Sequence, residues 1–334
     1  MTAVAMVVTV AVRVVVRVIM QGAAHERKIQ RSSDLVGSGS PGQVPGRILR
    51  PPAMHRRSFL AAAVGTLAAA CAKRPRTAVE RRPVPRIGPV GLQLYTVRTL
   101  MEKDMPGTLQ QVAAIGYREV EFAGYFGRTP AEVRALLARV GLTSPSSHTP
   151  YELLVGNWQK ALDDANAVGH QWVTIPWLAP EQRPTSVAGW QRLAATLARG
   201  AEQAHASGLR FAYHNHDFEI TPVEGVMPLE VLLRDTDPTR VDFEMDVYWV
   251  TKAGADAVSL LARHPGRFKM LHLKDATPAP QRAFADVGSG TIDWPAVLAQ
   301  RATAGVEHVF VERDESPDPM ASIRNSYAYL ASLK

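Results

Sequence analysis

The 334-residue chain has a single cysteine, Cys71, so no disulfide can form within it. Long apolar runs are also missing, because the Val- and Ala-rich residues 1–20 are interrupted by Arg13 and Arg17. A membrane-spanning helix needs about 20 apolar residues with few charges. Glycine and proline occur 24 times each, which is ordinary usage and excludes a collagen-like or low-complexity chain. With 46% apolar and 21% charged residues, the composition is that of a globular protein.

The positive charge of the chain is confined to its N-terminal part. Residues 1–86 hold 15 of the 38 Lys and Arg residues but only three of the 31 Asp and Glu residues. The remainder has 23 bases against 28 acids, a net charge of −5. Because sequence-independent nucleic-acid binding depends on positive charge, we expect no nucleic-acid partner for this body.

Residues 54–71 resemble a twin-arginine export signal. The paired Arg56 and Arg57 follow Met54, an uncharged run spans 61–70, and small residues precede Cys71. We therefore predict that the protein starts at Met54. Residues 1–53 are then an upstream extension, included in error and without ordered structure.

Cys71 leaves two alternatives open. It is either the lipid-bearing cysteine of a bacterial lipoprotein or a residue at a plain cleavage site after Ala-x-Ala, since Leu67 stands four rather than three residues before it. Residues 72–86 are basic, contain proline and are predicted to form a tether. Either alternative predicts an exported protein, periplasmic or anchored to the outer side of the inner membrane through Cys71.

From Gly88 onward, short β-branched and aromatic runs alternate with amphipathic stretches, which is typical of parallel strands with crossover helices. The predicted strands are Val90–Thr96, Tyr117–Phe122, Thr143–His148, Trp172–Pro176, Arg210–His216, Arg240–Asp246, Phe268–Lys274 and His308–Arg313. The predicted helices are Gly107–Ile115, Pro130–Val140, Trp158–Val168, Val187–Ser207, Met227–Arg234, Ala255–Arg263, Trp294–Ala304 and Pro317–Leu333. Eight such units over residues 87–334 predict a single (β/α)₈ TIM barrel. A doubly wound open sheet is the alternative, but no Gly-x-Gly-x-x-Gly follows the first strand.

The ends of the predicted strands are polar. TIM barrels carry their chemistry at the carboxyl ends of the strands, so these residues are the candidate site. They are Gln93, Tyr95, Glu121, His148, His214, His216 with Glu219 beyond, Glu244 and Asp246, His272 and Lys274, and Glu312. Carboxylates and histidines that converge in a buried mouth are costly unless they are paired or bind a metal.

These donors predict one divalent metal. A mixed set of imidazole and carboxylate ligands favours Mn, Zn, Co or Fe. Mg prefers oxygen ligands alone and is a less favoured alternative. Because side chains alternate along a strand, Glu244 and Asp246 share one face of their strand, and His272 and Lys274 share one face of theirs. Spacing does not decide which member of each pair binds the metal. His148 is equally consistent with a structural role. Lys274 is either a solvated charge or the cation for a substrate oxyanion, and Trp249 is either packing or a platform for a sugar ring.

Four motifs resemble the sugar phosphate isomerase/epimerase family, which has the xylose-isomerase-like TIM barrel. They are Gly91–Arg98 (GLQLYTVR), Tyr213–Glu219 (YHNHDFE), Phe243–Val250 (FEMDVYWV) and Leu271–Asp275 (LHLKD). The same barrel is used by ketose 3-epimerases, inosose dehydratases and type IV endonucleases. The resemblance covers Gly88 to the C-terminus and says little about substrate.

The resemblance implies a metal held by Asp246, His272 and Glu312, together with a fourth ligand from the fifth strand. The family commonly has Glu at that fourth position, where this chain has His214. In the ketose epimerases that Glu is also one of two proton-shuttling bases. Those enzymes have a further His where this chain has Trp249. A symmetric shuttle between two carboxylates therefore cannot operate unchanged, and His216 or Glu219 is an alternative source of the fourth ligand.

A single base next to a metal suffices to remove a C–H proton and reach an enediolate, which leads to isomerisation or to β-elimination. We assign Glu312 or Glu219 as the base, His214 or His216 as the acid and Lys274 to the oxyanion. Gln93, Tyr95, Glu121, His148, His216 and Trp249 are assigned to substrate binding. Because phosphorylated sugars are mainly cytoplasmic, an exported enzyme favours a non-phosphorylated sugar, keto-sugar or glycoside.

Two other functions fit the same fold. The first is a sugar-binding lipoprotein that has kept the barrel without turnover. The second is an abasic-site endonuclease, which fits poorly because the body has no excess of positive charge and too few ligands for a multi-metal cluster. The sequence leaves the oligomeric state open.

Overall fold

The computed structural model describes residues 88–333, and the structural statements below concern that part of the chain. The predicted extension (1–53), the export signal (54–71, with Arg56, Arg57 and Cys71) and the tether (72–86) lie outside the described residues. Within 88–333, no helix combines the length and the apolar character needed to cross a membrane.

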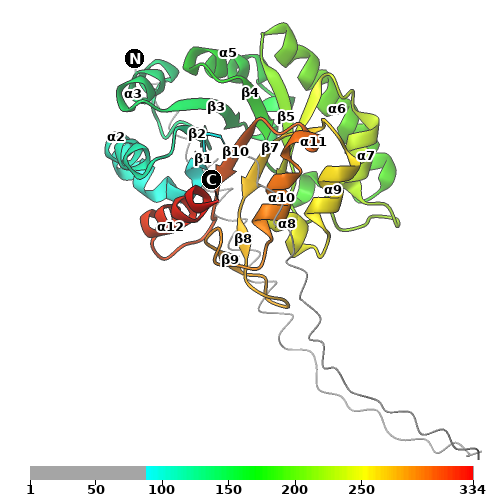
Figure 1. The fold of residues 1–334 in the computed structure, drawn as a ribbon. Helices are drawn as coiled ribbons and strands as arrows, with labels where there is room; N and C mark the ends of the chain where they lie inside the picture. Colours follow the sequence, from blue (N-terminus) through cyan, green and yellow to red (C-terminus); the bar gives the residue numbers. More distant parts are fainter. Residues whose placement is uncertain (1–87, 334) are drawn as a thin grey trace, which may run out of the picture. The chain divides into compact units, whose positions relative to one another are not determined.

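Eight parallel strands close into a barrel, with helices around it, which confirms the predicted TIM-barrel fold (Figure 1). Each strand pairs with the next barrel strand along the chain, and the last pairs with the first. The strands are β1 (Gly91–Gln93), β2 (Glu119–Phe122), β3 (Thr143–His148), β4 (Trp172–Ile175), β5 (Arg210–His214), β6 (Val241–Asp246), β7 (Phe268–Leu273) and β10 (His308–Val311).

The outer layer consists of helices. They are α2 (Arg98–Ile115), α3 (Pro130–Val140), α4 (Tyr151–Val155), α5 (Trp158–Val168), α6 (Val187–Ala206), α7 (Pro228–Asp235), α8 (Val247–Lys252), α9 (Ala257–Arg263), α10 (Trp294–Ala299), α11 (Arg301–Ala304) and α12 (Pro319–Ser332), with short 3₁₀ turns η1 (Leu94–Val97) and η2 (Pro180–Gln182). Helix α3 shows why such predictions succeed. Thr129 and Glu132 form a capping box at its start, and Gly141 ends it at φ +72°, a conformation that favours glycine.

Seven of the eight predicted strands are one to four residues longer than the observed strands, and in the first and the fifth the difference moves a candidate site residue off the strand. The first ends at Gln93 instead of Thr96, because the Gln93 side chain accepts a hydrogen bond from the Tyr95 N–H at 3.0 Å and starts η1. Tyr95 therefore lies on this turn and not on a strand. The fifth strand ends at His214, so His216 lies in the following loop.

The interior of the barrel is layered along the strands. Side chains of Trp172, Ala212, Met270 and Phe310 form an apolar cluster inside it. Gly91 pairs with Phe310, and a Cβ at this glycine would lie 2.4 Å from the Phe310 ring, so glycine leaves the space that the ring needs. Two residues further along the same strands the side chains are polar: Thr174, His214, His272 and Glu312. The apolar cluster therefore forms the floor of a polar layer at the carboxyl ends.

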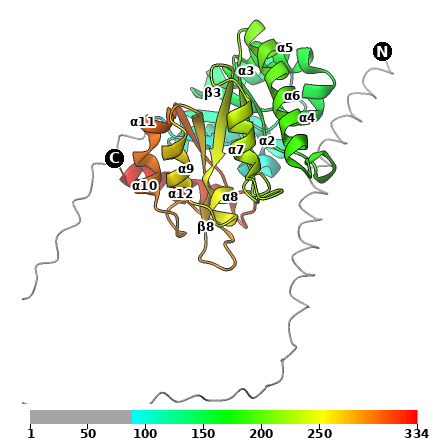
Figure 2. The same cartoon turned by 90° about the vertical axis from the view of Figure 1, so that its right-hand side faces the viewer.

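A hairpin that the sequence did not predict follows β7. Strands β8 (Asp275–Ala276) and β9 (Phe284–Ala285) pair antiparallel, and the hairpin projects next to α8 (Figure 2). Phe284 packs on Tyr248 of α8, with ring centroids 4.5 Å apart, and the Tyr248 hydroxyl donates to the Arg282 carbonyl at 2.8 Å. The hairpin is thereby fixed beside the carboxyl ends of β6 and β7.

Candidate active site

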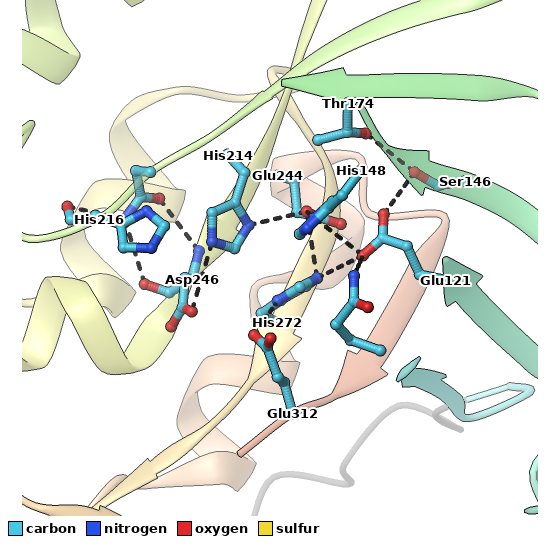
Figure 3. A network of polar contacts seen from close by, with 12 residues as sticks. Glu121, Ser146, His148, Thr174, His214, His216, Glu244, Asp246, His272 and Glu312 are labelled. Carbon is cyan, nitrogen blue, oxygen red and sulfur yellow. Dashed lines mark hydrogen bonds and ion pairs between the residues drawn. The ribbon is translucent and has the colours of Figure 1, made fainter. Parts of the chain in front are cut away.

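Polar side chains from β1 to β4 form one side of the layer. The Glu121 carboxylate accepts hydrogen bonds from Gln93 Nε2 at 2.8 Å and from the Ser146 hydroxyl at 2.5 Å. Ser146 also lies 3.0 Å from the Thr174 hydroxyl. His148 Nε2 lies 3.2 Å from the Glu121 Oε2 atom. This side is hydrogen-bonded and reaches across the barrel to His272, whose Nε2 lies 2.7 Å from the same Glu121 oxygen (Figure 3).

The other side of the layer contains the predicted metal ligands. One ligand atom each from Asp246, His272 and Glu312 lies within 4.8 Å of the others, and all three residues are buried. His214 Nε2 lies 3.7 Å from Asp246 Oδ2. The register explains the proximity, since Asp246 pairs with His272 across β6 and β7. Three of the residues predicted to hold a metal therefore converge on one place, and the fourth, His214, lies beside Asp246 in a neighbouring group that shares His272.

Lys274 lies against the same carboxylates. Its Nζ is 2.9 Å from Asp246 Oδ2, 2.8 Å from Glu312 Oε2 and 2.6 Å from Asp314 Oδ1. Burial lowers the pKa of Lys274, but Asp246, Asp314 and Glu312 outweigh burial and raise it well above the ordinary lysine value. Lys274 is thus a permanent buried cation and not a solvated rim charge.

Glu244 stands among the strand-end candidates, but no role was assigned to it from the sequence. Its Oε2 atom lies 2.8 Å from His148 Nε2, 2.9 Å from His214 Nδ1 and 3.2 Å from His272 Nε2 (Figure 3). These four residues form a second group with ligand atoms within 4.8 Å of one another. Alternation along β6 placed Glu244 on the same side as Asp246, but only the closed barrel shows that it faces three imidazoles, from β3, β5 and β7.

The site has more carboxylates than fixed cations. Burial raises the pKa of Glu312, but Lys274 and His272 outweigh it and hold that pKa well below the ordinary value. Burial lowers the pKa of His148, but Glu121 and Glu244 outweigh it and raise it to about 9. Negative charge is therefore in excess, and a further cation would offset it.

The donor set fits a divalent metal. Asp246 Oδ2 is buried and accepts no hydrogen bond from the described residues, although it lies beside the Lys274 ammonium. Two carboxylates and two imidazoles are the mixture that suits Zn, Mn, Co or Fe. Asp246, His272, Glu312 and His214 are thus the residues that could hold such an ion.

Glu219 lies apart from this group. Its Oε1 accepts a hydrogen bond from the Tyr213 hydroxyl at 2.5 Å, and its Oε2 accepts one from the His216 backbone N–H at 2.8 Å. Tyr213 precedes His214 on β5 and therefore points to the opposite face of the strand. Glu219 therefore links β5 to the loop that follows it through these two hydrogen bonds.

His216 and Trp249 border the metal group, through the His214 ring and the Asp246 carboxylate. The His216 and Trp249 rings lie 5.0 Å apart, and His216 Nδ1 and Trp249 Nε1 are buried without hydrogen-bond partners among the described residues. The Lys274 ammonium lies 5.5 Å from the centroid of the Trp249 ring. Tyr95 carries the Arg98 guanidinium 3.9 Å above its ring. The unpartnered nitrogens are available for the hydroxyls of a ligand.

The chain is similar to proteins that act on small sugar-like molecules. An inosose dehydratase of Geobacillus kaustophilus (strain HTA426) is 25% identical over 264 residues, which are 68% of this chain and 84% of that protein. The crystal structure of a sugar phosphate isomerase/epimerase from Parabacteroides distasonis ATCC 8503 is 27% identical, with a TM-score of 0.64 over 72% of this chain and 92% of that one.

A more distant structure shares the fold alone. The 3-keto-D-glucoside 4-epimerase YcjR from E. coli is 17% identical, with a TM-score of 0.55 over 73% of this chain and 98% of that one. The similarity therefore extends across isomerase, epimerase and dehydratase enzymes, in agreement with the resemblance read from the four motifs. Residues 109–333 match the family described as xylose isomerase-like TIM barrel, and the chain belongs to that family.

Proposed function

We propose that this protein is a divalent-metal-dependent enzyme that removes a C–H proton beside the carbonyl of a non-phosphorylated keto-sugar or keto-glycoside. The convergence of Asp246, His272 and Glu312, with the Lys274 ammonium against two of them, carries the proposal. A bound cation would polarise the substrate oxygen and so acidify the neighbouring C–H bond.

Glu312 is the proposed base. Its side chain is 7% exposed, whereas those of Glu121, Glu244 and Asp246 are completely buried. Because Lys274 and His272 keep it ionised, Glu312 can accept a proton, and Lys274 lies close enough to stabilise charge that develops on the substrate oxygen.

One base favours β-elimination or isomerisation over a symmetric epimerisation. His214 stands where the epimerases have their second carboxylate, and the Glu219 carboxylate is occupied by Tyr213 and His216. The similarity to an inosose dehydratase, an enzyme whose name denotes the loss of water, is consistent with elimination. His216 and Trp249 are proposed to contact substrate hydroxyls, with Tyr95 at the border of the site.

Gln93, Glu121 and His148 are proposed to support this site through their hydrogen bonds to one another and to His272. We further propose that the protein is exported. This part of the proposal depends on residues 54–71 alone, and it is the reason for preferring non-phosphorylated substrates.

The test is solvent exchange. Full-length protein loaded with Zn²⁺, Mn²⁺ or Co²⁺ is incubated in D₂O with a panel of keto-sugars and keto-glycosides, and proton NMR follows loss of the signal next to the carbonyl. We expect exchange or elimination, and a loss of about 100-fold or more in Glu312→Gln. Glu307→Gln is the matched control, because Glu307 precedes the same strand and pairs with Arg210 at the opposite end of the barrel.

Two results would contradict the proposal. The first is the absence of exchange and elimination across the panel in metal-loaded protein. The second is exchange in Glu312→Gln at the rate of the unmodified protein. Tight sugar binding without exchange, retained in Glu312→Gln, would identify the sugar-binding lipoprotein instead.

A further inference from the structure

One oxygen atom of Glu244 contacts three imidazole rings. Its Oε2 lies 2.8–3.2 Å from one nitrogen each of His148, His214 and His272, and the side chain is completely buried. The other oxygen, Oε1, has no hydrogen-bond partner among the described residues. The polar contacts of this carboxylate among the described residues are thus made with histidines.

Two of these rings link Glu244 to the metal group. His214 directs Nδ1 to Glu244 at 2.9 Å and Nε2 toward Asp246 Oδ2 at 3.7 Å. His272 directs Nε2 to Glu244 at 3.2 Å and Nδ1 to Glu312 at 2.8 Å. The strand register fixes this arrangement, because His214 pairs with Glu244 and His272 pairs with Asp246. Each ring therefore has one nitrogen on the Glu244 side and one on the ligand side.

We propose that Glu244 is the positioning residue of the metal site. It accepts the N–H of His214 and shares that of His272 with Glu121, whose oxygen lies nearer to His272 Nε2. These contacts fix the ring orientation and the tautomer in which the opposite nitrogen has its lone pair toward Asp246 and Glu312. A carboxylate that accepts the second N–H of a histidine ligand commonly changes metal affinity by 10- to 100-fold. This inference rests on the proposed metal site.

Glu244 also explains how the chain accommodates His214. When one nitrogen of a buried imidazole faces a metal, the other carries an N–H that needs an acceptor, because an unpaired buried N–H is costly. A glutamate ligand has no such N–H. Glu244 lies directly across the strand pair from His214 and provides that acceptor. Glu121 is not an equivalent, since of the two histidines it contacts only His272, at 2.7 Å.

The test compares Glu244→Gln and Glu244→Met in full-length, metal-stripped protein. A glutamine oxygen can take the place of Oε2 and its amide the place of the unpartnered Oε1, so this variant keeps a weaker acceptor. Methionine removes the acceptor. Titration with Co²⁺, followed by the visible absorption bands of the bound ion, gives the affinity and the coordination geometry. We expect affinity to fall about tenfold in Glu244→Gln and about 100-fold in Glu244→Met, with a changed Co²⁺ spectrum.

Asp242→Asn is the matched control. Asp242 is a buried carboxylate two residues earlier on β6, and it pairs with Trp172 Nε1 and Arg210 without contact to the three histidines. We expect Asp242→Asn to keep the Co²⁺ affinity and spectrum. Nitrogen-15 NMR of labelled histidines should also show the Nδ1–H form of His214 in the metal-free protein, and a mixture of forms in Glu244→Met.

The inference is overturned if both Glu244 variants, shown to be folded by circular dichroism, bind Co²⁺ with the affinity and the spectrum of the unmodified protein. Such a result leaves the proposed function standing when the unmodified protein catalyses exchange. Conversely, a metal-binding protein that responds to the Glu244 substitutions but exchanges no substrate proton would contradict only the proposed function.

Discussion

At the scale of single residues, the pKa values of two buried glutamates, Glu312 and Glu219, are shifted in opposite directions. Glu312 lies against Lys274, which outweighs burial and keeps its pKa well below the ordinary value. Burial raises the pKa of Glu219 to about 8, even though the Tyr213 hydroxyl and the His216 N–H lower it. Near neutral pH, Glu312 is therefore a carboxylate and Glu219 is protonated.

Protonation of Glu219 predicts a pH-dependent stability. Because its folded pKa is raised above 4.5, the folded state holds a proton that the unfolded state releases between pH 4.5 and 8. Its contribution to stability is complete below pH 4.5 and decreases by about 1.4 kcal/mol per pH unit as the pH rises through this window.

Glu219→Gln cannot ionise, so its stability relative to the unmodified protein should improve steadily from pH 5 to 8. Urea unfolding at several pH values measures this difference, in which the contributions of all other groups cancel. A difference that is constant with pH would show that Glu219 is ionised in the folded protein.

The residues of the site differ in how far the sequence predicts them. Asp246, His272 and Glu312 stand at strand ends in a barrel, where parallel topology brings distant residues together, and the resemblance to the family assigned them to the metal. Glu244 was a strand-end candidate without an assigned role, because its importance depends on which rings lie opposite it, and register is not contained in the sequence of one strand. Glu219 was assigned as a base from proximity along the chain, whereas its side chain faces Tyr213.

At the scale of elements, the loop after β7 is organised by one carboxylate. Asp275 Oδ1 accepts hydrogen bonds from the backbone N–H groups of Ala276 and Ile292. Its Oδ2 accepts from the N–H groups of Gly288 and Gly290 and from Trp294 Nε1. Asp275 therefore ties the β8–β9 hairpin and the start of α10 to the carboxyl end of β7.

Asp275→Asn should destabilise the protein on the order of 3 kcal/mol, because an amide nitrogen cannot accept and leaves at least two buried N–H groups unpaired. Urea unfolding measures the change. Asp293→Asn is the control, since Asp293 caps α10 through the Ala296 N–H and asparagine caps equally well, within about 0.5 kcal/mol. A loss below about 1 kcal/mol in Asp275→Asn would mean that the loop tolerates release of these bonds.

Local chemistry explains which elements the sequence predicts. Helices α3 and α5 have the predicted bounds, because a glycine in the left-handed region ends each of them and a capping box also begins α3. The predicted helix Trp294–Ala304 is divided at Gln300 into α10 and α11. The β8–β9 hairpin escaped prediction because its strands have two residues each and are held by Asp275 and by packing on α8, which are contacts from elsewhere in the chain.

At the scale of the whole molecule, the barrel separates an apolar floor from a polar layer in which carboxylates exceed fixed cations. The floor of Trp172, Ala212, Met270 and Phe310 closes the layer from below. Lys274 offsets part of the negative charge, and His148, whose pKa Glu121 and Glu244 raise to about 9, offsets more. A divalent cation held by Asp246, His272 and Glu312 would complete this balance, and the proposed chemistry depends on it.

Metal stoichiometry measures this claim most directly. Full-length protein is stripped with a chelator, titrated with Zn²⁺ or Mn²⁺ in a calorimeter and analysed for bound metal, in parallel with Asp246→Asn. We expect one ion per chain, with a stabilisation of about 2.7 kcal/mol against unfolding at a free-ion concentration 100 times Kd, and loss of both in Asp246→Asn. An unmodified protein that binds no ion, or an Asp246→Asn variant that binds it equally well, would contradict the account.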